Sequence, residues 1–293
     1  TLKTDNKKME GVEIQLILDE LNTKLNRKVL KPDKDMNVEK GNIVFLKHLY
    51  KHIRIKYNNK TYKENDIIFI MNMSQRIPLA EKMRPKKLDE VIGQSHLIGK
   101  NGILRKIIEN KEPISLIFWG PAGTGKTTLS RILANEVNAD FIEISAVTSG
   151  KKDIEKVIEH ARQNWNLGTR TILFVDEIHR FNKSQQDAFL PHIESGLINL
   201  IGATTENPGF EIITPLLSRS RVLSLKPLNT EEISKIIKNA LEKVSPKTKI
   251  DPEALKIIAK ISSGDARNAL GNLELILNFE KNNITPEVIT MYV

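Results

Sequence analysis

The sequence predicts an α/β protein in which a parallel five-stranded sheet is followed by a small helical domain. Two observations carry this prediction. From residue 114 on, short and almost wholly apolar runs alternate with helical segments, as is typical of a parallel sheet that helices cover on both faces. After Lys226-Pro227 the apolar runs stop and only helical segments follow, so a helical domain is expected there.

The expected strands are short runs of β-branched and other apolar residues, each followed by a polar loop. They lie at 115–119, 140–144, 171–175, 198–204 and 221–225. Helices between them are expected at 128–137, 151–164 and 184–194, and Pro191 should bend the last of these. The helical domain should contain helices at 231–244, 252–261 and 265–278, with caps at Thr230, Asp251 and Gly264-Asp265.

Three units are expected: an N-terminal segment at 1–72, the α/β domain at 73–226 and the helical domain at 227–293. The N-terminal segment has helical spacing at 12–25, and short strands or helices surround a turn at Asn58-Asn59. These short elements are expected at 43–49, 52–57 and 66–71. No motif stands in this segment, which reads as an appended module of unknown fold and function.

The composition excludes several classes of protein. With 40% hydrophobic and 28% charged residues, the 293-residue chain is neither disordered nor membranous, and no apolar run approaches the ~18 residues of a membrane span. The absence of cysteine excludes disulfides, thiolate zinc sites and cysteine nucleophiles, and it fits a reducing cytoplasm. A net charge of +9 is compatible with a polyanionic partner such as DNA or RNA.

The stretch GPAGTGKT at 120–127 matches the phosphate-binding loop GxxxxGK[ST] and stands between an expected strand and an expected helix. Backbone N–H groups of such a loop cradle phosphate oxygens, and the helix dipole favours the same anion. Lys126 should reach the β- and γ-phosphates of ATP, and Thr127 should ligate Mg²⁺. The predicted nucleotide-binding residues are Gly120, Pro121, Ala122, Gly123, Thr124, Gly125, Lys126, Thr127 and Thr128.

Asp176 and Glu177 end the apolar run at 171–175. Beside a phosphate loop, the first carboxylate is expected to hold Mg²⁺ through water, and the second to act as general base toward the attacking water. An Asp-Glu pair that merely caps the following turn is the alternative. The upstream loop favours the catalytic interpretation.

Polar residues elsewhere could assist the same chemistry. Thr204 and Thr205 follow another expected strand, where a hydroxyl could sense the γ-phosphate or orient water. Arg219 precedes the fifth strand, and Arg267 opens a helix of the helical domain. An arginine can stabilise charge on a transferring phosphoryl group, although a surface ion pair is the simpler interpretation of either arginine alone.

Five stretches together resemble one family. They are AEKMRPKKLDEVIGQ at 80–94, GPAGTGKTT at 120–128, FVDEIHRFNKSQQDAFLPHIE at 174–194, LIGATTENPGFEI at 200–212 and LLSRSR at 216–221. They resemble the replication-associated recombination protein family RarA (MgsA), bacterial relatives of the Werner-helicase-interacting protein in the clamp-loader branch of AAA+ ATPases. The resemblance covers about residues 75–293 and leaves 1–72 without a match.

The resemblance implies an AAA+ phosphate-loop fold with a helical lid, and roles for further residues. Val91, Ile92 and Gln94 would lie near the adenine, and Thr204 or Thr205 would be the first sensor. Arg219 resembles the finger that one subunit offers to its neighbour's ATP, and Arg267 the second sensor in the lid. The C-terminal oligomerisation domain of the family is absent from residues 227–293, and zero cysteines exclude the zinc module of its eukaryotic relatives.

The expected function is that of a DNA-dependent, Mg²⁺-dependent AAA+ ATPase in replication-fork maintenance, repair and recombination. It would act at forked, gapped or other single-strand/duplex junctions, as an oligomer in the cytoplasm and associated with the nucleoid. A clamp-loading or branch-migrating motor is one alternative. Another is an ATP-gated module that recruits partners such as single-strand DNA-binding protein. A small-molecule kinase is least favoured, because nothing resembles an acceptor site.

Overall fold

The computed structural model describes residues 55–57, 60–62 and 77–293. In the N-terminal unit, β1 (Ile55–Tyr57) pairs antiparallel with β2 (Lys60–Tyr62), and Tyr57 lies opposite Lys60. β1 falls within the element expected at 52–57. The elements expected at 12–25, 43–49 and 66–71 lie outside the described residues.

A five-stranded parallel sheet forms the centre of the α/β domain, as predicted. Its order is β4-β5-β6-β3-β7, and every neighbouring pair is parallel. All five strands therefore end at the same edge of the sheet. Their bounds are β3 (Leu116–Trp119), β4 (Asp140–Ser145), β5 (Thr171–Asp176), β6 (Asn199–Thr204) and β7 (Arg221–Ser224).

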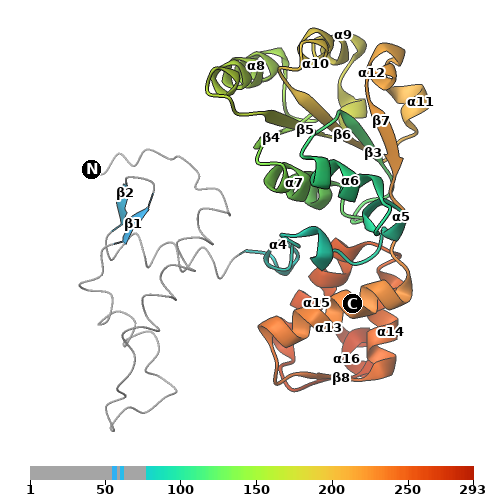
Figure 1. Ribbon diagram of the computed structural model, residues 1–293. Coiled ribbons are helices and arrows are strands. Elements are labelled where there is room, and N and C mark those ends of the chain that lie inside the picture. Colours follow the sequence, from blue (N-terminus) through green and yellow to red (C-terminus); the bar gives the residue numbers. More distant parts are fainter. Residues whose placement is uncertain (1–54, 58–59, 63–76) are drawn as a thin grey trace, which may run out of the picture. The chain divides into compact units, whose positions relative to one another are not determined.

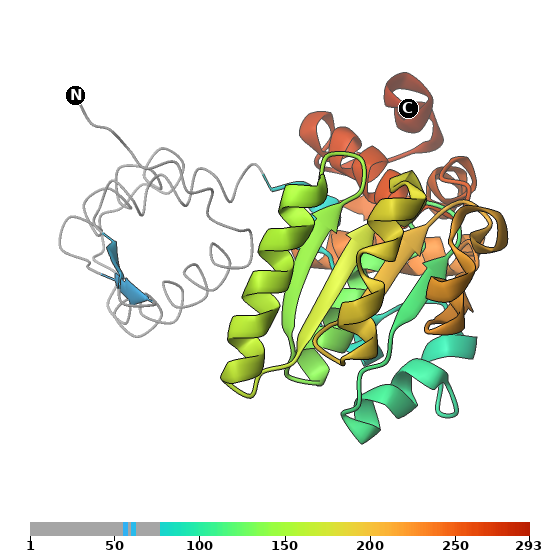
Figure 2. The same cartoon turned by 90° about the horizontal axis from the view of Figure 1, so that it is seen from above.

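Helices cover both faces of this sheet (Figures 1 and 2). One face carries α6 (Ile103–Asn110) and α7 (Lys126–Glu136), which pack on Phe118 and Phe174. Their strand neighbours Ile117, Leu173 and Val175 point to the other face and pack against the helices there. Those helices are α8 (Lys151–Asn166), α9 (Lys183–Asp187), α10 (Leu190–Glu194) and α12 (Thr214–Ser218). Burial on both faces explains why the strands read as continuous apolar runs.

The helix expected at 184–194 is two helices, α9 and α10, separated by Ala188 and Phe189. Pro191 lies in the first turn of α10. Proline has no N–H to donate to the residue four positions earlier, and its ring clashes with that carbonyl, so the helix breaks instead of bending. Phe189 is completely buried at this break and packs near Phe181.

The lid is mainly helical, as predicted, and contains α13 (Thr230–Val244), α14 (Pro252–Ile261), α15 (Ala266–Phe279) and α16 (Pro286–Tyr292). Asp251 and Asp265 cap α14 and α15 as expected. The predicted cap at Thr230 is wrong, because Asn229 caps α13 in a capping box with Glu232. Strands do not stop at 226 either: β8 (Lys249–Ile250) pairs with β9 (Asn283–Ile284).

One short helix ahead of the sheet packs in the lid. In α4 (Leu79–Lys82), Leu79 is buried in the same apolar cluster as the lid helices, with Met83 against it. The N–H of Leu79 donates to Glu274 of α15 at 3.0 Å. The boundaries expected at 72/73 and 226/227 stay predictions, but the apolar core of the lid includes this earlier segment.

Four short helices complete the described chain: η1 (Leu88–Glu90), α5 (Ser95–Ile98), η2 (Ile178–Arg180) and α11 (Pro208–Glu211). Among the described residues, no helix has both the length and the apolar character that a membrane crossing requires.

Candidate nucleotide-binding and hydrolysis site

The phosphate loop connects the end of β3 to the start of α7. Its backbone could not be built with larger residues at two positions. At Gly120 the φ angle is 156°, and a Cβ would lie 2.4 Å from the carbonyl oxygen of Leu225. At Gly123 the φ angle is 66°, and a Cβ would lie 1.8 Å from Asp265 of the lid. The glycines thus permit both the loop conformation and the close approach of the lid.

Lys126 begins α7, and its side chain lies over the loop. The residue is buried, and its Nζ donates to the carbonyl oxygens of Gly120 at 2.7 Å and Pro121 at 2.9 Å. Burial lowers the pKa of Lys126, while the carboxylates of Glu177 and Asp176 act in the opposite direction. The ammonium group therefore lies within reach of the charge of both predicted catalytic carboxylates.

Asp176 ends β5 and belongs to a local excess of negative charge. Burial raises the pKa of Asp176, and the nearby charges of Glu177 and Glu143 raise it further. The carboxylate of Asp176 and the hydroxyl of half-buried Thr127 are, by their chemistry, the kind of hard oxygen ligands that Mg²⁺ prefers. The residues present thus fit the predicted Mg²⁺.

Glu177 adopts a backbone conformation that non-glycine residues rarely use, with φ of 51°. It forms the N-terminal boundary of η2. One of its carboxylate oxygens, Oε2, is buried and forms no hydrogen bond. The structure thus leaves one oxygen of the predicted general base without a hydrogen-bond partner.

His179 was not among the residues singled out from the sequence. Its Nδ1 lies 2.9 Å from the hydroxyl of Thr204 and 3.3 Å from Oε2 of Glu177. Thr204 is completely buried at the end of β6, whereas Thr205 is exposed. The structure therefore brings one of the two predicted sensor hydroxyls into contact with a histidine that lies beside Glu177, and leaves the other sensor residue exposed.

Two predicted adenine contacts, Val91 and Ile92, are partly buried, and Gln94 is buried. The amide of Gln94 accepts from the N–H of Lys226 at 3.0 Å and donates to the carbonyl of the same residue at 2.6 Å. It also lies 3.4 Å from the carbonyl oxygen of Thr124 in the phosphate loop. Gln94 thus connects the loop to the segment that leads into the lid.

The start of α15 brings Arg267 toward the loop. The N–H of Ala266 donates to the carbonyl of Gly123 at 3.3 Å. Burial is the main cause that lowers the pKa of Lys126, and the positive charge of Arg267 lowers it further. The exposed side chain of Arg267 therefore lies near enough to the predicted phosphate site to influence its charge.

Arg219 lies elsewhere. Its guanidinium pairs with Glu194 of α10 at 2.5 Å and donates to the carbonyl of Pro215 at 2.9 Å. Both partners belong to helices on the face of the sheet opposite α7. The side chain of Arg219 is 38% exposed.

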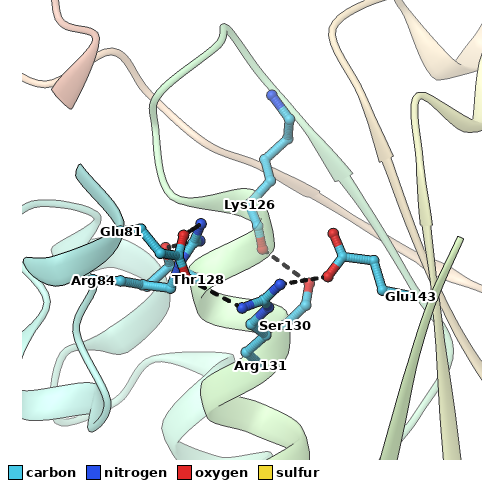
Figure 3. Close-up of polar contacts among 7 residues, drawn as sticks. All are labelled: Glu81, Arg84, Lys126, Thr128, Ser130, Arg131 and Glu143. Carbon is cyan, nitrogen blue, oxygen red and sulfur yellow. Dashed lines mark hydrogen bonds and ion pairs between the residues drawn. The ribbon is translucent and has the colours of Figure 1, made fainter. Parts of the chain in front are cut away.

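A second cluster missed from the sequence lies behind the loop (Figure 3). Arg84 donates to the hydroxyl of Thr128 in the first turn of α7 at 3.0 Å and pairs with Glu81. Arg131 joins Glu81 to Glu143, at 3.4 and 2.7 Å. The only sequence signal was that Glu81 and Arg84 stand in the motif at 80–94, because contacts over 44 and 50 positions cannot be inferred from spacing.

The chain is similar to several known proteins. Residues 116–228 match the ATPase family associated with various cellular activities (AAA). Replication-associated recombination protein A of Escherichia coli (strain K12) is 51% identical over 227 residues, which are 73% of this chain and 50% of that protein. ATPase WRNIP1 of Dictyostelium discoideum is 44% identical over 229 residues, 76% of this chain and 26% of that protein.

A solved structure from Thermotoga maritima, described as the RuvB Holliday junction branch migration motor, is also similar. Its TM-score is 0.59 at 30% identity, over 71% of each chain. The chain spans about half the length of the replication-associated recombination proteins that it matches.

Proposed function

The chain belongs to the family of replication-associated recombination protein A, within the AAA ATPases, and from this premise we propose that it is a DNA-dependent ATP hydrolase of replication-fork maintenance, repair and recombination. One observation carries the proposal. The phosphate loop, Asp176, Glu177 and Thr204 meet at the edge where parallel strands β3, β5 and β6 end. Ligands of open α/β sheets bind at this edge.

The reaction is hydrolysis of the terminal phosphoanhydride of ATP. The oxygen of water attacks the γ-phosphorus, the bond from that phosphorus to the bridging oxygen breaks, and ADP leaves with the bond's electrons. Glu177 accepts the proton of the water, while Lys126 and the loop N–H groups hold the phosphate oxygens. When bound through Thr127 and Asp176, Mg²⁺ supplies positive charge to the phosphates.

Two arginines complete the proposed site. Arg267 stabilises charge on the phosphates from the lid of the same chain, consistent with its influence on Lys126. Arg219 serves the ATP of a neighbouring subunit, because it is partly exposed and its contacts lie on the face opposite α7. A finger that acts on a neighbour requires self-association into a ring or similar oligomer.

The proposed nucleic-acid substrate is DNA at forked, gapped or other single-strand/duplex junctions. A net charge of +9 supports a polyanionic partner, the similar protein of Escherichia coli is named for recombination, and the similar solved structure is named for Holliday junctions. Single-strand DNA-binding protein is a further candidate partner at such junctions. The likeness to the RuvB motor favours branch migration as a second candidate function.

The experiment is an ATPase assay over a DNA panel, with Lys126→Ala as the blank. Single-stranded, duplex, forked, gapped and four-way DNA are compared at one salt concentration, since phosphate contacts weaken with salt. We expect forked and gapped DNA to give the highest rate. A preference for four-way junctions would favour branch migration. A measurable rate that is the same on every DNA and without DNA would contradict the proposal and favour an ATP-gated recruitment module.

A further inference from the structure

Nδ1 of His179 has two oxygen neighbours that belong to different parts of the proposed reaction. One is the hydroxyl of Thr204 at 2.9 Å, and the other is Oε2 of Glu177 at 3.3 Å. Only the hydroxyl is bonded, since Oε2 has no hydrogen-bond partner. In the tautomer that carries its hydrogen on Nδ1, the ring can donate fully to only one of these oxygens, and a change at Thr204 is then felt at Glu177.

The fold holds the histidine firmly in this place. Turn η2, which carries His179, packs on β6 where Gly202 has no side chain. A Cβ at Gly202 would lie 2.9 Å from Ile178, next to His179, and 2.8 Å from Ile117. The imidazole is only 8% exposed. The absence of a side chain at Gly202 thus leaves room for Ile178 and Ile117 against β6.

Thr204 lies next to the phosphate loop, where bound nucleotide could change its contacts. Its backbone carbonyl accepts from the N–H of Gly120, the first residue of the phosphate loop, at 3.1 Å. Its hydroxyl also accepts from the N–H of Glu206 at 3.0 Å. A γ-phosphate near this hydroxyl would compete with His179 for it. The freed Nδ1 could then bond Oε2, with a shift of a few tenths of an ångström.

We propose that His179 is a positioning residue that couples the hydroxyl of Thr204 to the carboxylate of Glu177, so that Glu177 is oriented for catalysis when the γ-phosphate engages Thr204. The proposal rests on the proposed function, in which Glu177 is the general base. His179 does not touch the reacting atoms. Its loss should therefore slow turnover and leave ATP binding unchanged, whereas a merely structural histidine would affect both or neither.

The test compares two amide variants of similar polarity. His179→Asn places an amide near the position of Nδ1, and His179→Gln places it near the position of Nε2. Steady-state kcat and KM, ATP affinity and thermal midpoint are measured for both. We expect His179→Asn to keep most of the turnover, and His179→Gln to lose roughly 10- to 100-fold in kcat at unchanged ATP affinity, as expected for a misplaced catalytic group.

A double-mutant cycle tests the coupling itself. Thr204→Val removes the hydroxyl, and His179→Gln should then cost much less in kcat than it costs beside Thr204, because the two residues act as one unit. Equal losses in both backgrounds would overturn the proposal. So would a kcat of His179→Gln within about twofold of the wild type, or equal losses in the Asn and Gln variants.

A measurement on the unchanged chain covers the case in which both variants unfold. The ¹⁵N chemical shift of Nδ1 of His179 is followed while a non-hydrolysable ATP analogue is added with Mg²⁺. We expect a shift change at this nitrogen, and no change would overturn the proposal. If the wild-type chain does not turn over ATP, the proposed function is contradicted and the inference falls with it. If the wild-type chain turns over ATP normally and His179→Gln has an unchanged kcat, only the inference is overturned.

Discussion

Asp176 shows at the scale of one residue how function and stability oppose each other. Its carboxyl is half-buried, and burial together with the charges of Glu177 and Glu143 raises its pKa. A raised pKa means that the ionised form is less favourable in the folded chain than in the unfolded chain. The same negative charge is what a bound Mg²⁺ would neutralise.

We therefore predict that Asp176→Asn stabilises the nucleotide-free chain at neutral pH while it abolishes turnover. The sign follows from linkage: the cost of ionised Asp176 is present above its folded pKa and is lost below the ordinary aspartate pKa of about 3.9. Urea unfolding midpoints should show a gain at pH 7 that shrinks as the pH falls. Asp89→Asn is the control, since that side chain is 82% exposed and should change little. An unstable Asp176→Asn at pH 7 would contradict this account.

Roles for the phosphate-loop residues could be proposed one by one from the sequence, because the GxxxxGK[ST] pattern lies within eight consecutive positions. His179 could not be singled out from the sequence, although it stands two positions from Glu177. Its proposed role depends on the packing of η2 against β6 and on the burial of Thr204, whereas Thr205 is exposed. Those distances are set by packing between separate strands and not by local spacing.

At the scale of elements, one buried side chain, that of Gln186, connects α9 to α11 and to the start of α12, the helix that Arg219 follows. Gln186 is 1% exposed, and its amide nitrogen donates at 3.0 Å to the carbonyls of Phe181 and Glu211. Its carbonyl oxygen accepts from the N–H of Ile213 at 3.0 Å, just before α12 begins. The long motif at 174–194 thus contains a structural connection between η2 and the Arg219 helix.

We predict that Gln186→Leu lowers the free energy of unfolding by at least about 2 kcal/mol. Three backbone groups would lose their partner, and leaving a buried polar group unpaired costs about 1–3 kcal/mol. Urea unfolding measures the loss. Gln163→Leu, at an exposed position of α8, is the control, with an expected change in the free energy of unfolding within about 0.5 kcal/mol. Equal effects of the two substitutions would show that the bonds of Gln186 contribute nothing.

Helix α4 gives a second prediction at this scale. Leu79 precedes the sheet in sequence but is buried with the lid helices. Leu79→Ala should therefore lower the free energy of unfolding by about 2–5 kcal/mol, as for other buried leucines. Leu167→Ala is the matched control, because Leu167 is 80% exposed. A loss no larger than that of the control would contradict the placement of α4 in the lid core.

Element types were predictable where periodicity is long, and errors arose where a short element depends on tertiary contacts. The five strands and the three main lid helices follow from apolar patterning. Strands β8 and β9 have two residues each and exist only because they meet across the lid, so no periodicity could reveal them. The break between α9 and α10 was underestimated as a bend at Pro191.

At the scale of the whole molecule, the account requires neighbouring subunits. Arg219 contacts α10 and its own helix, and its proposed role is on the ATP of a neighbour. We predict that Arg219→Ala and Lys126→Ala are each nearly inactive but recover part of the turnover when mixed. In a mixed oligomer, an Arg219→Ala subunit supplies a phosphate loop with intact Lys126, and a neighbouring Lys126→Ala subunit supplies intact Arg219, so the interface between them contains both wild-type residues. Absence of recovery in oligomers of confirmed mixed composition would contradict a finger in trans.

The central claim is that ATP is hydrolysed at the meeting point of the phosphate loop and Glu177, and one measurement on Glu177→Gln tests it most directly. ATP affinity and single-turnover hydrolysis are determined for the variant and the wild type in the presence of forked DNA. The account predicts near-normal affinity and a rate lowered by about 100-fold or more, the usual contribution of a general base. Near-normal hydrolysis by Glu177→Gln would contradict it.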